Sequence, residues 1–396
     1  MSKLREWVFM MWRPILAFLV VSVIVSFAFT YKLGRLTPAA SNVEKQYVTS
    51  IDSGQKILDH PVYAVHKIPV YALNKLNVKS IAPYRAVSAV FAILAVVSCF
   101  FVLREWFSDR IAALGAILFM NSAWILHTSR LAIPEASFLL LMPLLWAVVW
   151  LYNTTLRKSA LLVLSFLCAA SFYVPGFGWL LFMSAIWQRK RLWEELSAVP
   201  IWFRLCCALI LVTGIVPLAW AAVGSPSVLL LAAGLPQQFP LPKDILLNFI
   251  NIPEYLLLRG PDDPVRWLGR LPLLDVFSGG MLLLGIYSIR YHLKLIRIQL
   301  LVGSSIILAA LLTFGGPLTI TVLMPAVYIL IASGVAFMLQ QWLAVFPKNP
   351  IARGLAIVLL LGSVSLVSLY HLRHYFVAWA GSPATKAAFS DKIDSN

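Results

Sequence analysis

The chain has 396 residues, of which 61% are hydrophobic and 12% are charged, and its mean hydropathy is +0.85. About a quarter of the residues of a soluble domain are charged, so this composition excludes a water-soluble protein and requires a bilayer as solvent. The net charge is +16, but the Lys and Arg residues lie in short clusters between apolar runs, where they set membrane topology. No basic stripe is interleaved with stacking aromatic residues, so we expect no nucleic-acid partner.

Apolar runs of spanning length follow one another along the whole sequence and predict an all-α polytopic membrane protein with about eleven transmembrane helices. Their ranges are 8–31, 84–103, 111–128, 135–153, 159–174, 176–188, 201–223, 272–289, 297–314, 317–342 and 353–371. No stretch between them is long enough for a separate soluble domain, so we expect a single transmembrane domain over 1–396. The first run is too long for the core of a signal peptide, which indicates an uncleaved anchor.

Basic residues lie in alternate short loops, as the positive-inside rule requires of a real topology. These loops contain Arg104 and Arg110, Arg157 and Lys158, Arg189, Lys190 and Arg191, Arg290, Lys294 and Arg297, and Lys348 and Arg353. Lys3 and Arg5 precede the first run, so the N-terminus is expected in the cytoplasm. An odd number of spans then places the C-terminal tail, 372–396, outside.

Two long loops fall on the outer side of this topology, at 32–83 and 224–271. Each contains a stretch with apolar residues at helical spacing, 43–58 in the first loop and 243–258 in the second. We expect these amphipathic helices to lie on the membrane surface.

Ionisable residues near membrane depth are the first candidates for function, because the bilayer makes them energetically expensive. Glu44 follows the first span, near the start of an expected helix. Its carboxylate has the chemistry of a general base toward an acceptor hydroxyl. It equally fits a solvated acid that the dipole favours at the beginning of a helix.

The outer turn at 127–135 contains Arg130, the one basic residue that breaks the charge rule of the short loops, and Glu135. An arginine at this level suits an anionic headgroup or a phosphate. The alternative is an Arg130 to Glu135 ion pair that only fixes the turn. Further basic residues on this face offer complementary charge to a phosphate or contact lipid headgroups. They are Lys67, Arg85, Arg259, Arg266 and Arg270.

Several of these segments, taken in order, resemble the GT-C membrane glycosyltransferases, which include protein O-mannosyltransferases and the lipid A aminoarabinose transferase. Stretch 42–47 (NVEKQY) is similar to the family's Asp-Glu pair followed by tyrosine, and 66–73 (HKIPVYAL) to its Lys-Pro-Pro-Leu segment. Stretch 84–88 (YRAVS) resembles the Ala-Arg-Leu opening of the second span. Stretch 129–135 (SRLAIPE) resembles the Arg-x-x-x-x-Asp outer turn.

The resemblance implies transfer of a sugar from a polyprenyl-phosphate donor to a glycan, lipid or protein acceptor on the outer face of the plasma membrane. Carried over to this sequence, it implies Glu44 as the catalytic base. It implies Lys67, Arg85, Arg130 and Glu135 as substrate-binding residues, and it allows a divalent metal ion as cofactor.

Val43 stands where the family has its aspartate, and 315–321 lacks the arginine that relatives often have there. Because of these departures, one alternative is that the chain is a non-catalytic GT-C-like component of an envelope complex. A transporter or flippase for a lipid-linked glycan is the other alternative. Transporters place ionisable residues near the middle of their spans, whereas here the charges lie at the span ends.

Overall fold

The computed structural model describes residues 22–390, which fold almost entirely into helices and confirm the all-α polytopic class. Six helical segments are long and apolar enough to cross a membrane, and a seventh is obtained if α6 (Asp109–Asn121) and α7 (Ala123–Ser129), bent by 59°, count together. The six are α5 (Ile81–Trp106), η1 with α8 (Pro134–Asn153), α12 (Ile201–Gly224), α16 (Ile296–Thr313), η2 with α17 (Ile320–Val345) and α18 with its π-helical end (Pro350–Trp379).

The count of about eleven spans is not confirmed. Three of the expected runs form helices that are shorter than the twenty or so residues that a bilayer requires. These are α9 (Arg157–Ser171), α10 (Phe177–Trp187) and α15 (Val276–Ile289). Gly176 separates α9 from α10 with a positive φ of 80°, a conformation that glycine adopts without steric cost. Most of the run at 8–31 lies outside the described residues.

The centre of the bundle is built around α15 and α17, which cross at two glycines. A Cβ atom at Gly285 would collide with the backbone oxygen of Leu330, and one at Gly334 with that of Met281. Small residues that let two backbones approach closely are a common device of membrane helices. This crossing supports η2, the 3₁₀ turn that lines the candidate site described below.

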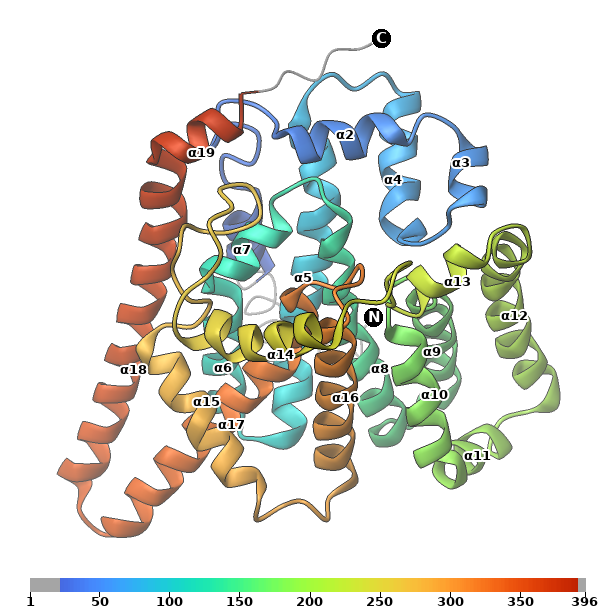
Figure 1. The fold of residues 1–396 in the computed structure, drawn as a ribbon. Helices are drawn as coiled ribbons and strands as arrows, with labels where there is room; N and C mark the ends of the chain where they lie inside the picture. Colours follow the sequence, from blue (N-terminus) through green and yellow to red (C-terminus); the bar gives the residue numbers. More distant parts are fainter. Residues whose placement is uncertain (1–21, 391–396) are drawn as a thin grey trace, which may run out of the picture.

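Short helices gather at one end of the bundle (Figure 1). They are α2 (Asn42–Ser50), α3 (Gly54–Asp59), α4 (Ala64–Lys75) and α19 (Pro383–Ala388). The expected amphipathic stretch 43–58 is therefore two helices rather than one, because the chain turns at Ile51. The opposite end contains α11 (Arg189–Ser197). The C-terminal α19 thus lies on the same face as the first long loop.

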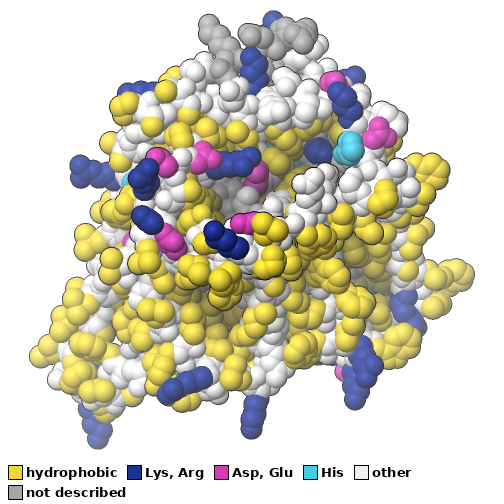
Figure 2. Space-filling view, viewed as in Figure 1, with side chains coloured by type: hydrophobic (Ala, Val, Ile, Leu, Met, Phe, Trp, Pro, Cys, Tyr) yellow, Lys and Arg dark blue, Asp and Glu magenta, His cyan; other side chains and the backbone are white. Residues whose placement is uncertain are grey.

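The second expected amphipathic stretch, 243–258, forms α14 (Pro242–Leu257), which runs across the bundle (Figure 1). Its Leu246, Leu247 and Phe249 are exposed, as suits a helix lying at a membrane interface. Figure 2 shows a broad hydrophobic belt with Lys and Arg side chains at its lower edge. Above the belt, charged side chains of both signs surround a hollow.

Candidate active site

Three distant parts of the chain enclose a cavity of about 290 Å³. Its walls come from α7 with the start of η1, from α14 with the 261–267 segment, and from the 315–321 turn that precedes and enters η2. The polar side chains in its lining are His127, Thr128, Glu135, Asn248, Asn251, Tyr255, Asp263, Arg266, Thr319 and Thr321. A concave site with a few convergent polar groups among apolar walls is the usual form of a substrate pocket.

Glu135 is the acidic residue that the first half of the chain contributes to this cavity. It enters η1 directly after Pro134, which fixes the backbone at the first position of the 3₁₀ helix. Its Oε2 atom is buried and finds no hydrogen-bond partner among residues 22–390. A carboxylate oxygen in this position is free to accept a proton from a bound hydroxyl.

The 261–267 segment contributes one acidic and one basic residue to the cavity lining, Asp263 and Arg266. Arg266 lines the same cavity and acts electrostatically on Glu135. Asp263 Oδ1 accepts hydrogen bonds from the backbone N–H groups of Val265 (2.9 Å) and Arg266 (3.0 Å). The carboxylate of Asp263 therefore fixes the turn that presents the Arg266 side chain.

Aromatic rings form the wall on the side of α7. The rings of Trp124 and Trp267 are 4.5 Å apart, and Trp124 Nε1 donates to Thr321 Oγ1 at 3.1 Å. The contact between His127 Nε2 and the carbonyl oxygen of Val265 is 2.9 Å long, so Nε2 carries the proton. His127 Nδ1 is then a buried acceptor with no partner in the described part of the chain.

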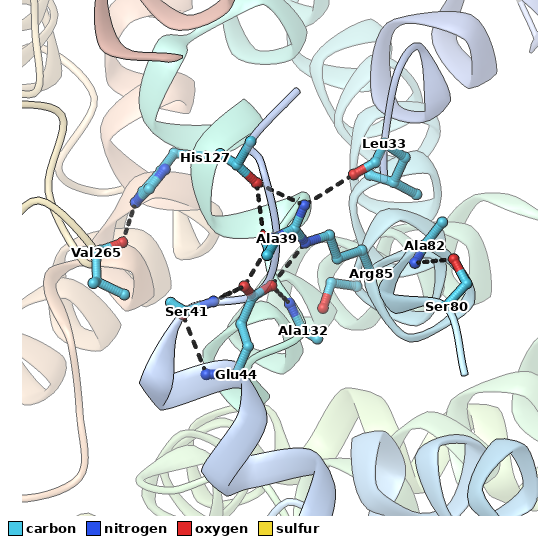
Figure 3. A network of polar contacts seen from close by, with 12 residues as sticks. Leu33, Ala39, Ser41, Glu44, Ser80, Ala82, Arg85, His127, Ala132 and Val265 are labelled. Atoms are coloured by element: carbon cyan, nitrogen blue, oxygen red, sulfur yellow. Dashed lines mark hydrogen bonds and ion pairs between the residues drawn. The ribbon is translucent and has the colours of Figure 1, made fainter. Parts of the chain in front are cut away.

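Glu44 lies outside this cavity, in a buried ion pair with Arg85 (Figure 3). Arg85 Nε and Nη2 each donate to the carboxylate at 2.8 Å, and the N–H of Ala132 donates at 2.8 Å. Ser41 completes a capping box: its N–H donates to Glu44 at 3.0 Å. Both oxygens of this carboxylate are occupied, so a base role for Glu44 has no geometric support.

The partners of Glu44 also set its proton affinity. Burial alone would raise the pKa of this carboxyl, but the charge and hydrogen bonds of Arg85, with the amides of Ala132 and Ser41, lower the pKa below its ordinary value. A carboxylate that holds its charge this firmly is a poor general base near neutral pH. Glu44 instead binds the backbone at Ala132, three residues before Glu135.

Arg85 is equally occupied. Besides Glu44, its guanidinium donates to the carbonyl oxygens of Leu33 (3.1 Å) and Ala39 (3.1 Å) and to Thr37 Oγ1 (3.0 Å). These contacts use all five N–H groups of an arginine, so none is left for a phosphate. Arg85 connects the first outer loop to α5.

Arg130 is also buried, and it does not form the ion pair with Glu135 that was the alternative to phosphate binding. Its guanidinium donates to the carbonyl oxygens of Ala28, Phe29 and Tyr31 at 2.5–3.1 Å, where the first described helix ends. It also lies 4.9 Å from the ring centre of Phe376. A cation at a helix C-terminus satisfies carbonyls that lack intrahelical partners, which gives Arg130 a structural position.

Lys67 lies on α4, half-buried, with its Nζ donating to the carbonyl oxygen of His60 at 2.6 Å. Burial lowers the pKa of this ammonium to about 8. Next to it, His66 is enclosed between Tyr47 and Ser88, with ring-nitrogen contacts of 2.9 Å to each hydroxyl. Burial lowers the pKa of His66 to about 3, so this imidazole is neutral at physiological pH.

The five residues proposed from the sequence thus occupy four places. Glu44 and Arg85 form one buried pair, Arg130 closes a helix end, and Lys67 lies on α4. Glu135 alone lines the cavity. Within residues 22–390 no group of three or more His, Cys, Asp or Glu side chains is placed to hold a metal ion.

No protein-family model and no curated protein matches the sequence, but solved structures share its architecture. The crystal structure of ArnT from Cupriavidus metallidurans in the apo state matches with a TM-score of 0.57 and 13% identity, covering 94% of this chain and 78% of that one. The structure of the same protein bound to undecaprenyl phosphate matches with a TM-score of 0.54 and 11% identity, covering 95% and 77%. At these identities the likeness shows that this chain shares the fold of ArnT.

Proposed function

We propose that this chain is a membrane glycosyltransferase that moves a sugar from a polyprenyl-phosphate donor to an acceptor hydroxyl, and that the transfer takes place in the cavity lined by Glu135. The fold shared with ArnT supports this class of donor, because one of the ArnT structures contains undecaprenyl phosphate. The observation that carries the proposal is the buried, partnerless Oε2 of Glu135 in the same cavity as Arg266.

In the proposed reaction Glu135 removes the proton of the acceptor hydroxyl as its oxygen forms a bond to the anomeric carbon of the sugar. The bond between that carbon and the donor phosphate breaks, and both electrons leave with the polyprenyl phosphate. The leaving phosphate gains negative charge, which the guanidinium of Arg266 stabilises. Asp263 contributes by fixing the backbone on which Arg266 sits.

Glu44 and Arg85 act in this proposal as positioning residues. Their ion pair connects α2 and α5 to the backbone N–H of Ala132, and Ala132 belongs to the turn that ends at Glu135. A buried pair with every donor satisfied allows little movement. The pair therefore fixes the backbone three residues before Glu135.

The direct test compares membranes from a strain that lacks the protein with membranes from the same strain after its gene has been restored. We expect label from one of a panel of radiolabelled undecaprenyl-phosphate monosaccharides to enter a non-donor product only when the protein is present. Movement of intact donor across the bilayer without a new linkage would identify a flippase. Unchanged donors across the panel would favour the non-catalytic alternative.

Arg266 provides a separate prediction about donor binding. Arg266→Gln is expected to raise the KM for the donor about tenfold, because a charge-assisted hydrogen bond contributes about 1.5–3 kcal/mol. Arg270→Gln is the matched control: Arg270 is exposed, pairs with Asp262 at 2.6 Å and does not line the cavity. Equal KM values for the two variants would remove Arg266 from the phosphate site.

Lys67 lies outside the Glu135 cavity and is therefore not a ligand of the donor phosphate at Arg266. It remains a proposed substrate contact, and its pKa of about 8 makes that role testable. The ammonium is charged below this pH and loses its charge as the pH rises through it, so kcat/KM for the donor should fall between about pH 7 and pH 9. Arginine keeps its charge over this range. Lys67→Arg should therefore flatten the alkaline limb, and an unchanged decline would show that Lys67 does not meet the donor.

A further inference from the structure

Two adjoining cavities, of about 260 and 300 Å³, lie at the end of the bundle opposite α2 and α19. They share Trp106 and Arg297 in their walls. The larger is enclosed by the ends of α5 and α8, by the α10–α11 junction and by the start of α16. This place is distinct from the Glu135 cavity, which lies toward the other face.

Two arginines at the larger cavity lie over aromatic rings. The guanidinium of Arg191 lies 4.3 Å from the ring centre of Tyr152, and that of Arg297 lies 5.6 Å from the ring centre of Trp106. A cation–π contact of this kind uses the face of the ring and leaves the N–H groups of the guanidinium able to donate to the oxygens of a phosphate.

Neither arginine pairs with a carboxylate within residues 22–390, whereas other arginines of this face do. Arg104 contacts Asp109 at 2.9 Å, and Arg157 contacts Glu195 at 3.2 Å. Two arginines without an ion-pair partner therefore lie beside one cavity, which the basic character of this face alone does not require.

The rest of the cavity wall suits a molecule with a polar head and an apolar body. Its neutral polar groups are Asn153 and Gln188, and Asn153 Nδ2 donates to the carboxylate of Glu105 at 2.7 Å. Glu105 keeps its negative charge in this bond, so the lining carries two positive charges and one negative charge. The remaining wall is largely aliphatic, with Val148, Leu300 and Ile329 among its members.

We propose that this cavity binds the phosphate of an acidic phospholipid from the leaflet at the basic face, with Arg191 and Arg297 as the phosphate ligands and the aliphatic wall receiving the lipid body. Two arginines without ion-pair partners, in a lining that stays net positive with Glu105 counted, complement an anionic headgroup attached to acyl chains beside this apolar recess. The site is independent of the sugar transfer proposed above, because none of its residues lines the Glu135 cavity.

The test titrates the delipidated full-length protein in detergent with phosphatidylglycerol, phosphatidylcholine or inorganic phosphate. Bound lipid is measured by native mass spectrometry, and the melting temperature is followed in parallel. We expect phosphatidylglycerol to bind at least tenfold more tightly than phosphatidylcholine and to raise the melting temperature, and we expect inorganic phosphate at the same concentration not to displace it.

The variant Arg191→Gln/Arg297→Gln should lose at least tenfold in apparent affinity for phosphatidylglycerol. Lys294→Gln/Lys348→Gln removes the same charge from exposed positions of this face outside the cavity and should stay within twofold of wild type. Arg191→Lys/Arg297→Lys keeps the charge but loses the planar N–H edge, and it should also weaken binding of phosphatidylglycerol. This variant serves as the test if the glutamine variant does not fold. Equal binding of the two phospholipids, equal losses in the cavity and control variants, or competition by inorganic phosphate would overturn the proposal.

Discussion

Replacing Glu135 with glutamine is expected to lower the rate of sugar transfer by about 10²–10⁴-fold, the usual contribution of a general base. Glutamine has nearly the shape of glutamate but cannot take up a proton. Because Oε2 of Glu135 has no hydrogen-bond partner within the described residues, the substitution removes no native contact of this atom. The melting temperature in detergent should therefore stay close to that of wild type while transfer is lost.

The matched control for this experiment is Glu254→Gln. Glu254 lies on α14 beside the same cavity, but it pairs with Arg259 at 2.7 Å and is absent from the cavity lining. It should retain transfer within a few-fold of wild type. A Glu135→Gln protein with more than a tenth of wild-type activity would show that another group takes the proton.

Breaking the Glu44–Arg85 pair should produce the largest loss of stability of any single substitution considered. Arg85→Met leaves a carboxylate that is 0% exposed without its cation, and an uncompensated buried charge costs about 3–5 kcal/mol. Glu44→Leu/Arg85→Met removes both charges and should recover part of this loss. Thermal unfolding in detergent measures both, and an Arg85→Met protein as stable as wild type would contradict the account.

The same pair predicts a pH dependence with a defined sign. Folding lowers the pKa of Glu44 below its ordinary value of 4.5, so the carboxylate stabilises the folded state above that pH. This stabilisation is lost as the pH falls from about 4.5 through the folded-state pKa. Acidification should thus lower the melting temperature of wild type more than that of Glu44→Gln.

The sequence predicted the membrane-spanning helices correctly wherever one apolar run forms one long helix, as in α5, α12 and α16. The expected count of about eleven spans is not confirmed, because hydropathy does not show how long a helix each apolar run forms. The turn at Gly176 and the 59° bend between α6 and α7 depend on local backbone geometry and packing. Runs that look alike in composition therefore form spans of different length.

The site was harder to predict because its contacts join remote parts of the chain. Glu44 meets Arg85 41 positions later and the N–H of Ala132 88 positions later, and neither distance leaves a local pattern. The resemblance drew attention to Glu44, whereas the structure places Glu135 in the cavity. Asp263 was missed, and Arg266 stood out only as one of several basic residues in the second long loop.

A structure of this protein with undecaprenyl phosphate bound is the most direct test of the proposed site. The account predicts that the lipid phosphate lies in the cavity of about 290 Å³, within hydrogen-bond distance of Arg266, with Glu135 facing the position of the sugar. A lipid phosphate held elsewhere, or one that opens the Glu44–Arg85 pair and binds there, would contradict it.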